Sequence, residues 1–189
     1  PQTPDPHSYG SAKFLAERLL AIASVRARFR YAVVRPSCIY GPGQHGHNAI
    51  PRFLRAALAG EAPTVFGDGA SVRDDVFAPD LATLMLEAAL RRTEGAYHAA
   101  GERERTILEV ARLCCDAVRA EGGPSVEPRL DPSRPPTWWI DQRFDRGPSD
   151  KSLGYWPVTL LAGLRRHVCW IAAGADPRDT ARFGRGAPS

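Results

Sequence analysis

The chain has 189 residues, of which 43% are hydrophobic and 24% charged, and its formal net charge is +4. A chain of this length is expected to form one sizeable core rather than two domains. It shows no run of 18 apolar residues, no signal peptide and no C-x-x-C pair or metal-ligand spacing among its four cysteines, so we expect no membrane span, no metal site and a reduced, cytoplasmic setting.

The basic residues are almost all arginine and are spread along the chain, with Lys13 and Lys151 as the two lysines. A nucleic-acid-binding protein would be expected to cluster its basic residues into a stripe with interleaved aromatics. We therefore do not expect nucleic acid as a partner. Isolated arginines are better suited to holding the phosphates of a small ligand, because each guanidinium offers paired planar donors.

The first half of the chain is predicted to alternate helices with short strands. From Tyr9 to about Ala27, apolar residues recur at helical spacing. Residues 30–40 are predicted to form a buried strand that Pro36 ends or bends. A Gly/Pro loop, a short helix at about 51–59 and a short strand with a turn at 63–69 follow. The apolar stripe of the first helix comprises Ala12, Leu15, Ala16, Leu19, Ile22 and Ala23.

The second half is predicted to hold three more helices and a short strand at about 95–101, and its proline-rich stretch at 122–148 offers two further candidate strands, near 126–130 and 139–144. Thr106 is predicted to be the N-cap of the second of these helices, and Glu109 completes a capping box three residues later. Cys114 and Cys115 fall on an apolar helical stretch and are predicted to be core thiols. The three helices run from about 79 to 91, 106 to 120 and 159 to 173. This alternation indicates an α/β protein, but too few strands look buried for a complete doubly wound sheet.

Tyr9 and Lys13 are the first candidates for a chemical role. They stand at i and i+4, so both project from one side of the first helix. A nearby ammonium favours the ionised form of a tyrosine, and a positioned tyrosine can exchange a proton with a hydroxyl or carbonyl of a substrate. The pattern alone is equally compatible with a tyrosine at a helix start beside an exposed lysine.

Four segments in order make the pattern more specific. "SYGSAKFLAERLL", "VVRPSCIYGPG", "VFGDGASVRDDVFAPDLA" and "LGYWPVTLLAGLRRHVCWI" together resemble the extended short-chain dehydrogenase/reductases, in the NAD-dependent epimerase/dehydratase group that acts on nucleotide sugars. The resemblance covers about residues 1–173. It implies the C-terminal part of a Rossmann-like doubly wound fold plus a small α/β substrate-binding region. It also implies NAD or NADP as cofactor, a nucleotide sugar as substrate and a homodimer.

The resemblance also implies site residues. Tyr9 would be the catalytic acid/base, and Lys13 would bind the nicotinamide ribose. Pro36 and Ile39 would line the nicotinamide ring. In the substrate region it points to Cys38, Asn48, Ala49, Phe66, Arg73 and Arg134, with Phe66 near the nucleotide base and the two arginines on the diphosphate. From the residues alone, Arg73 is equally well explained as a partner of Asp74 or Asp75, and Arg134 as a surface residue.

The chain departs from the family pattern at several positions. Cys38 stands where many members carry an asparagine that contacts substrate, Asp75 where an aromatic is usual and Pro79 where an acid is usual. These differences leave two alternatives open. One is a reductase of the same family that acts on a non-sugar alcohol or ketone, and the other is a non-catalytic remnant that binds a nucleotide sugar or a partner chain.

Only eight residues precede Tyr9, too few for the strand, glycine loop and helix of a Rossmann fingerprint. Residues 1–175 are therefore interpreted as one partial domain and 176–189 as a flexible tail. The chain does contain G-x-G-x-x-G at Gly41, Gly43 and Gly46, but Pro42 removes a backbone donor there and no helix opens at the third glycine. We interpret this loop as a turn. Within the partial domain, residues 1–47 and 74–100 are assigned to the Rossmann-like sheet and 48–73 and 101–173 to the substrate-binding region.

Overall fold

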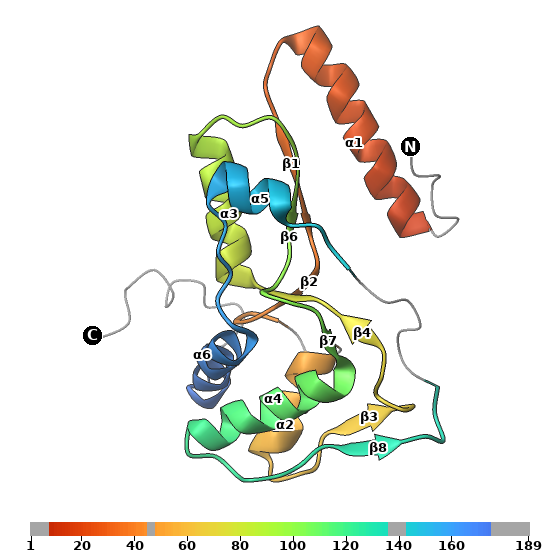
Figure 1. Cartoon of the computed structure of the whole chain (residues 1–189), viewed down its shortest axis with the longest axis vertical. Helices are drawn as coiled ribbons and strands as arrows, with labels where there is room; N and C mark the ends of the chain where they lie inside the picture. Colours follow the sequence, from red (N-terminus) through yellow and green to blue (C-terminus); the bar gives the residue numbers. More distant parts are fainter. Residues whose placement is uncertain (1–7, 45–47, 136–142, 175–189) are drawn as a thin grey trace, which may run out of the picture.

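The computed structural model describes residues 8–44, 48–135 and 143–174. The molecule is elongated, with two lobes one above the other in Figure 1. The sheet lobe contains α1 (Ser8–Ala27), β1 (Ala32–Pro36), α3 (Ala78–Leu90), β6 (Gly95–Ala99) and α5 (Gly147–Leu153). The helical lobe contains α2 (Ala49–Leu58), β3 (Thr64–Phe66), α4 (Ile107–Ala120), β8 (Arg129–Asp131) and α6 (Leu160–Ala172). The junction between them consists of β2 (Cys38–Tyr40), β4 (Val72–Arg73), β5 (Asp75–Phe77) and β7 (Arg105–Thr106).

The strand predicted at residues 30–40 is two strands, because the chain changes partner at Ser37. β1 pairs in parallel with β6, and β2 pairs in parallel with β5. The Ser37 amide still donates to Ala99 O (2.8 Å), whereas the Cys38 amide donates to Asp74 O (3.1 Å). The prediction of a buried strand was wrong for β1, which is only half-buried at Val33 and Val34. Among the described residues β1 has β6 as its one ladder partner, so its other edge is uncovered.

The remaining pairings lie within the helical lobe and within the junction. β3 pairs in parallel with β8, and β4 pairs antiparallel with β7, which places Arg73 opposite Arg105. Parallel strands connected by helices confirm the predicted α/β class. The sequence analysis missed β4, β5, β7 and α5, because each is too short to show a clear period.

The predicted capping box of α4 is confirmed. The Thr106 amide donates to Glu109 Oε2 (2.7 Å), and the Glu109 amide donates to Thr106 Oγ1 (3.2 Å). The predicted helices at 51–59, 79–91 and 159–173 correspond to α2, α3 and α6. Thr159 caps α6 by accepting a hydrogen bond from the Ala162 amide (3.3 Å). Helix starts were therefore predictable from local chemistry.

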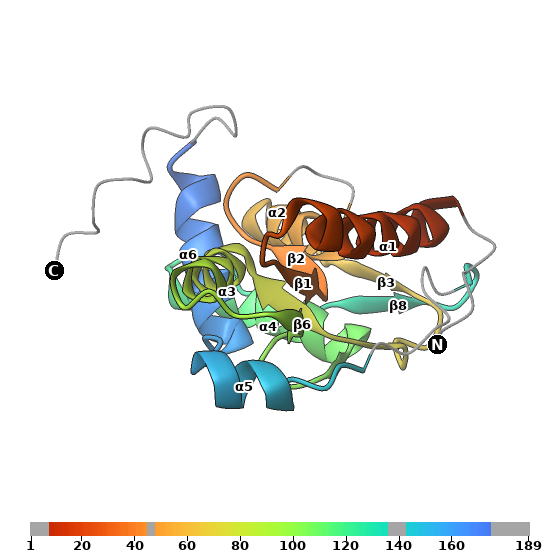
Figure 2. The same ribbon diagram turned by 90° about the horizontal axis from the view of Figure 1, so that it is seen from above.

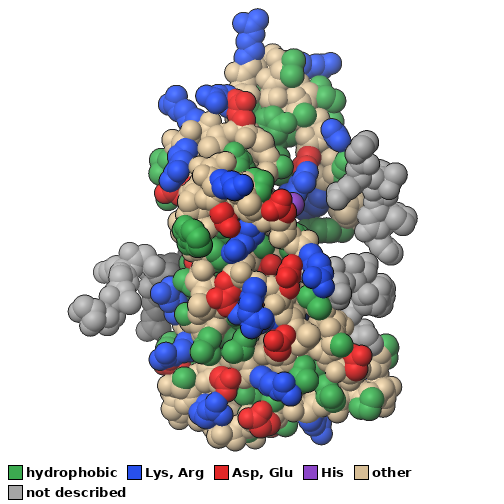
Figure 3. Space-filling view, in the orientation of Figure 1, with side chains coloured by type: hydrophobic (Ala, Val, Ile, Leu, Met, Phe, Trp, Pro, Cys, Tyr) green, Lys and Arg blue, Asp and Glu red, His purple; other side chains and the backbone are tan. Residues whose placement is uncertain are grey.

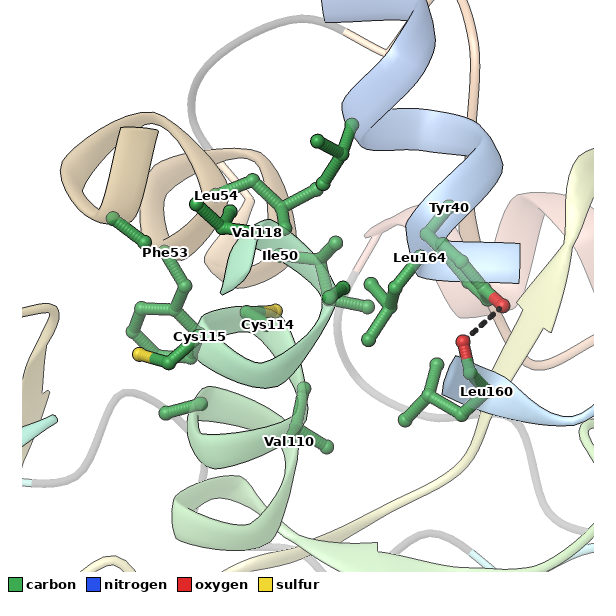
Figure 4. Close-up of a cluster of buried hydrophobic side chains, with 14 of the residues drawn as sticks. Tyr40, Ile50, Phe53, Leu54, Val110, Cys114, Cys115, Val118, Leu160 and Leu164 are labelled. Atoms are coloured by element: carbon green, nitrogen blue, oxygen red, sulfur yellow. Dashed lines mark hydrogen bonds between the residues drawn. The ribbon is translucent and has the colours of Figure 1, made fainter. Parts of the chain in front are cut away.

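The core of the helical lobe lies between α2, α4 and α6, as Figure 4 shows. Cys114 and Cys115 are buried in it, which confirms that they are core thiols. The Tyr40 hydroxyl donates to Leu160 O (3.4 Å) at the start of α6. A Cβ at Gly163 would stand 2.0 Å from the Tyr40 oxygen, so α6 can approach the junction this closely only with glycine there.

The first helix differs from its prediction. α1 forms as expected, but its apolar stripe is exposed: Leu15 is 57% and Leu19 66% accessible. The half-buried face of α1 instead carries Phe14, Glu17 and Ala21, and Glu17 forms a two-bond ion pair with Arg35 of β1 (2.6 and 2.9 Å). Polar contacts therefore join α1 to β1, the strand that follows it in the chain, while the apolar stripe of α1 is exposed.

Candidate active site

Tyr9 and Lys13 lie together at the start of α1. The Lys13 Nζ is 5.4 Å from the centroid of the Tyr9 ring, and the Tyr9 side chain is 74% exposed. α1 and β1 run in opposite directions (Figure 1), so the helix begins toward the end of the lobe where β1 ends. Ligands of open α/β sheets bind outside the carboxyl ends of the parallel strands. The pair therefore lies at the edge of the lobe where such a ligand is expected.

Pro36 and Ile39 lie at that same edge. Pro36 ends β1 and is exposed, and Ile39 in β2 is 42% exposed. Both side chains are exposed, so their apolar surfaces are available to a flat ring.

Arg73 is engaged by Asp75. Its Nε donates to both Asp75 oxygens (3.2 and 3.0 Å) and its Nη2 donates to Oδ1 (2.7 Å). The two side chains are 10% and 2% exposed. Burial raises the pKa of the Asp75 carboxyl, and Arg73 opposes that shift. Of the acids that the sequence offered as partners of Arg73, Asp75 forms the ion pair, and it occupies one whole edge of the guanidinium.

Around this pair the junction holds further buried charge. Arg105, opposite Arg73, pairs with Glu102, and burial lowers the pKa of Arg105. Asp74 accepts from the Ser37 hydroxyl (3.1 Å) and the Gly101 amide (2.5 Å). Two arginines directly opposite each other repel, so these acids are needed on the same face. The sequence analysis missed Arg105, because the charged residues before it, 102–104, give no apolar signal.

The other substrate-side candidates surround α2 and β2. Cys38 is half-buried, and its strand register places it opposite Asp75. Asn48 is exposed at the N-cap of α2 and makes no side-chain capping bond, and Ala49, half-buried, is the first residue of the helix. Asp75 therefore links Cys38, its partner in the strand register, to Arg73, its partner in an ion pair. Asn48 and Ala49 lie at the start of α2.

Phe66 is the last residue of β3, and the guanidinium groups of two arginines lie over its ring. Arg52 Cζ lies 5.4 Å and Arg134 Cζ 5.2 Å from the centroid of its ring. Arg52 comes from α2 and Arg134 from the loop after β8, so three elements meet at this ring. The sequence analysis named Phe66 and Arg134 but missed Arg52, since helical periodicity marks it only as a polar surface position.

The glycine loop is a turn, as predicted. Gly41 and Gly43 both have positive φ, and the Gln44 amide donates to Gly41 O (3.1 Å). A Cβ on Gly41 would stand 3.1 Å from the Phe77 ring. The next helix, α2, begins at Ala49, and Gly46 lies outside the described residues. The loop thus lacks the strand–glycine–helix geometry of a phosphate cradle.

Charge on the surface is mixed. On the face drawn in Figure 3, acidic and basic side chains alternate over both lobes. In the described part of the chain, no helix combines the length and apolar character that crossing a bilayer requires. The same residues include no group of three or more His, Cys, Asp or Glu side chains that could hold a metal ion.

Known proteins resemble the chain along most of its length. It is 28% identical over 183 residues to dTDP-glucose 4,6-dehydratase of Neisseria gonorrhoeae, which covers 92% of this chain and 53% of that protein. It is 38% identical over 148 residues to dTDP-4-dehydro-6-deoxy-D-allose reductase of Streptomyces bikiniensis, covering 74% and 42%. The chain thus spans about half the length of these curated relatives.

Solved structures give the same fold. UDP-glucuronic acid 4-epimerase from Bacillus cereus, solved with UDP-glucuronic acid and NAD, superposes with a TM-score of 0.74 at 22% identity, over 93% of this chain and 55% of that one. Such neighbours are Rossmann-like, which confirms the predicted fold class. The sequence model of the NAD dependent epimerase/dehydratase family matches residues 2–100. The chain therefore belongs to the NAD dependent epimerase/dehydratase family.

Proposed function

We propose that this chain is the C-terminal portion of an NAD- or NADP-dependent enzyme that transforms a nucleotide sugar. The observation that carries the proposal is the Tyr9–Lys13 pair at the carboxyl edge of the parallel strands, with a basic substrate region in the adjoining lobe. The family match supports it, and so do relatives named as a dehydratase and a reductase of dTDP-linked sugars.

In this proposal the residues of the chain divide the work. Tyr9 takes the proton from a sugar hydroxyl, and Lys13 holds the nicotinamide ribose. Pro36 and Ile39 present an apolar surface to the nicotinamide ring. When bound, the cofactor supplies the acceptor for the hydride. Cys38, Asn48 and Ala49 orient the sugar.

The phosphate-binding groups are proposed in the helical lobe. Arg134 contributes a charged guanidinium beside Phe66. Arg73 contributes the N–H groups that Asp75 leaves free. A diphosphate accepts several hydrogen bonds at once, so donors from two elements fix its position.

The test is a substitution of Tyr9 by Phe in the full-length protein, assayed with UDP-glucose and dTDP-glucose in the presence of NAD. We expect turnover to fall by at least a hundredfold while the protein still binds the nucleotide sugar, because the phenol oxygen acts on the reacting proton. Tyr31→Phe, which removes a hydroxyl from a half-buried tyrosine of the same lobe, is the matched control. Undiminished turnover by Tyr9→Phe contradicts the catalytic role.

The product identifies the reaction class. A 4-keto-6-deoxy sugar indicates a dehydratase, an inverted C4 hydroxyl an epimerase, and consumption of NADH with a keto sugar a reductase. A parent protein that binds nucleotide sugars and turns none over would instead support the non-catalytic alternative.

Two coarser expectations also remain proposals. The exposed stripe of α1, with Leu15, Leu19 and Ile22, supports a homodimer through this helix. The four cysteines, all within the described residues, form no disulfide with one another, which supports a reduced, cytoplasmic setting. Sedimentation of the full-length protein as a monomer at micromolar concentration would contradict the first.

A further inference from the structure

Two arginines beside Phe66, Arg52 and Arg134, form no ion pair with any acid among the described residues. Arg52 and Arg134 both place their guanidinium over the Phe66 ring. Two like charges that converge on one ring repel each other unless an anion joins them. The arrangement is therefore complementary to an anionic ligand.

Two acids lie in the vicinity, Asp131 and Glu61, and neither forms an ion pair with Arg52 or Arg134. Asp131 Oδ1 accepts from both the amide and the hydroxyl of Ser133 (3.1 and 2.5 Å). The Ser133 hydrogen bond lowers the pKa of Asp131, and Arg134 and Arg129 add to the shift. Glu61 lines the adjoining groove of about 600 Å³ together with Arg52, Arg55 and Arg129. The surroundings of Phe66 thus keep an excess of positive charge.

Arg73 stands in contrast to this pair. Asp75 neutralises its charge inside the protein, through contacts that both side chains make while almost fully buried. A neutralised guanidinium can still donate hydrogen bonds from its free edge, but it attracts an anion weakly. The net charge that recruits a diphosphate must then come from elsewhere in the lobe.

Stacking on Phe66 prepares the two arginines for this role. A guanidinium that lies over an aromatic ring keeps its N–H groups at the perimeter of the plane, where they remain free to meet oxygen. The ring also restricts side chains that would otherwise lose much conformational entropy on binding. Phe66 in this arrangement supports the arginines as a platform.

We infer that Arg52 joins Arg134 as the charged clamp for the diphosphate of the substrate, with Phe66 as their shared platform and Arg73 as a donor of hydrogen bonds. The inference rests on the proposed function, because the diphosphate belongs to the nucleotide sugar. It adds Arg52 to the site and moves the role of Phe66 from base contact to support of the clamp.

The test measures nucleotide binding by calorimetry in the full-length protein. The variants are Arg52→Ala and Arg55→Ala, which remove the same charge from neighbouring exposed positions of α2. UDP and dTDP are the charged probes, and uridine and thymidine lack the phosphates. We expect Arg52→Ala to weaken diphosphate binding about tenfold and Arg55→Ala less than about twofold. Affinity for the nucleosides is expected to stay unchanged in both variants.

The conservative variant separates charge from geometry. Arg52→Lys keeps the charge but not the planar stack, so we expect an intermediate loss of about threefold. Circular dichroism and the melting temperature of each variant show whether α2 has kept its fold. Both arginines of α2 are exposed, so neither substitution is expected to lower the melting temperature by more than a few degrees.

Three outcomes would overturn the inference. Equal losses from Arg52→Ala and Arg55→Ala would mean that the general field of the lobe attracts the ligand. An equal loss of nucleoside and diphosphate affinity in Arg52→Ala would place this residue on the base. Failure of the unsubstituted protein to bind either diphosphate would contradict the proposed function itself, and the inference with it, and this outcome is seen before any variant is made.

Discussion

The two lobes of the molecule are built from similar amounts of secondary structure but bury it differently. In the helical lobe, Leu54, Val110 and Leu164 are fully buried between α2, α4 and α6. In the sheet lobe, α1 buries none of its described residues, and Leu15, Leu19 and Val25 face outward. α3 buries Leu84 and Ala88 in a second core cluster and exposes Met85, Leu86 and Leu90. The helical lobe therefore has the larger buried core, whereas the sheet lobe leaves more of its apolar helix surface exposed.

The largest expected effect lies at the junction of the lobes. Replacing Asp75 by Ala leaves Arg73 as a buried, unpaired charge, so we expect a loss of about 3 to 5 kcal/mol in the free energy of unfolding. The double variant R73M/D75L removes both charges and is expected to be much less destabilised. The measurement is urea denaturation followed by circular dichroism. A double variant as unstable as Asp75→Ala would show that packing, rather than the unpaired charge, causes the loss.

Truncation of one leucine in each lobe tests the comparison directly. Leu164→Ala opens a cavity in the closed core and is expected to cost about 3 kcal/mol in the free energy of unfolding. Leu19→Ala, on the exposed stripe of α1, is expected to cost less than about 0.5 kcal/mol in the same monomeric chain. Urea titrations of both variants check this. Equal losses would mean that the two lobes are closed to the same extent.

Acid should act on the helical lobe through His167. Burial, with a contribution from Arg55, lowers the pKa of His167 to about 4 from the ordinary value of 6.5. Between pH 6.5 and pH 4 this histidine is protonated in the unfolded chain but neutral in the folded chain. The free energy of unfolding is therefore highest above pH 6.5 and falls by about 2 to 3 kcal/mol as the pH is lowered to 4. His167→Leu should flatten this part of the profile, measured as melting temperature against pH. An unchanged slope would assign the acid sensitivity to other groups.

A more local effect is expected at the capping box of α4. Thr106→Ala removes the oxygen that accepts from the Glu109 amide and is expected to cost about 1 kcal/mol. Thr106→Ser keeps the oxygen and serves as control. Thr93→Ala, whose hydroxyl bonds Ala88 O beside α3, gives a matched loss of one hydroxyl in the sheet lobe. If Thr93→Ala lowered the free energy of unfolding more than Thr106→Ala, the sheet lobe would be the more sensitive of the two lobes, contrary to this expectation.

Much of the secondary structure was predictable because its signals are local. Thr106 and Glu109 mark a helix start within four residues, and the spacing of Tyr9 and Lys13 places them on one side of α1 whatever the helix packs against. The short strands β4 and β7 were missed, since two residues cannot show a period. The stripe of α1 was predicted correctly as apolar, but periodicity cannot say which surface it meets.

For the candidate site, the sequence by itself determined the types of residue and their order along the chain. It identified Tyr9, Lys13, Phe66 and Arg134, and it offered both a phosphate and an acid as the partner of Arg73. Only the tertiary structure decided that Asp75 takes this arginine and that Arg52 reaches the ring of Phe66. The physical reason is that charge balance depends on distances between side chains from different elements, and spacing along one element does not contain those distances.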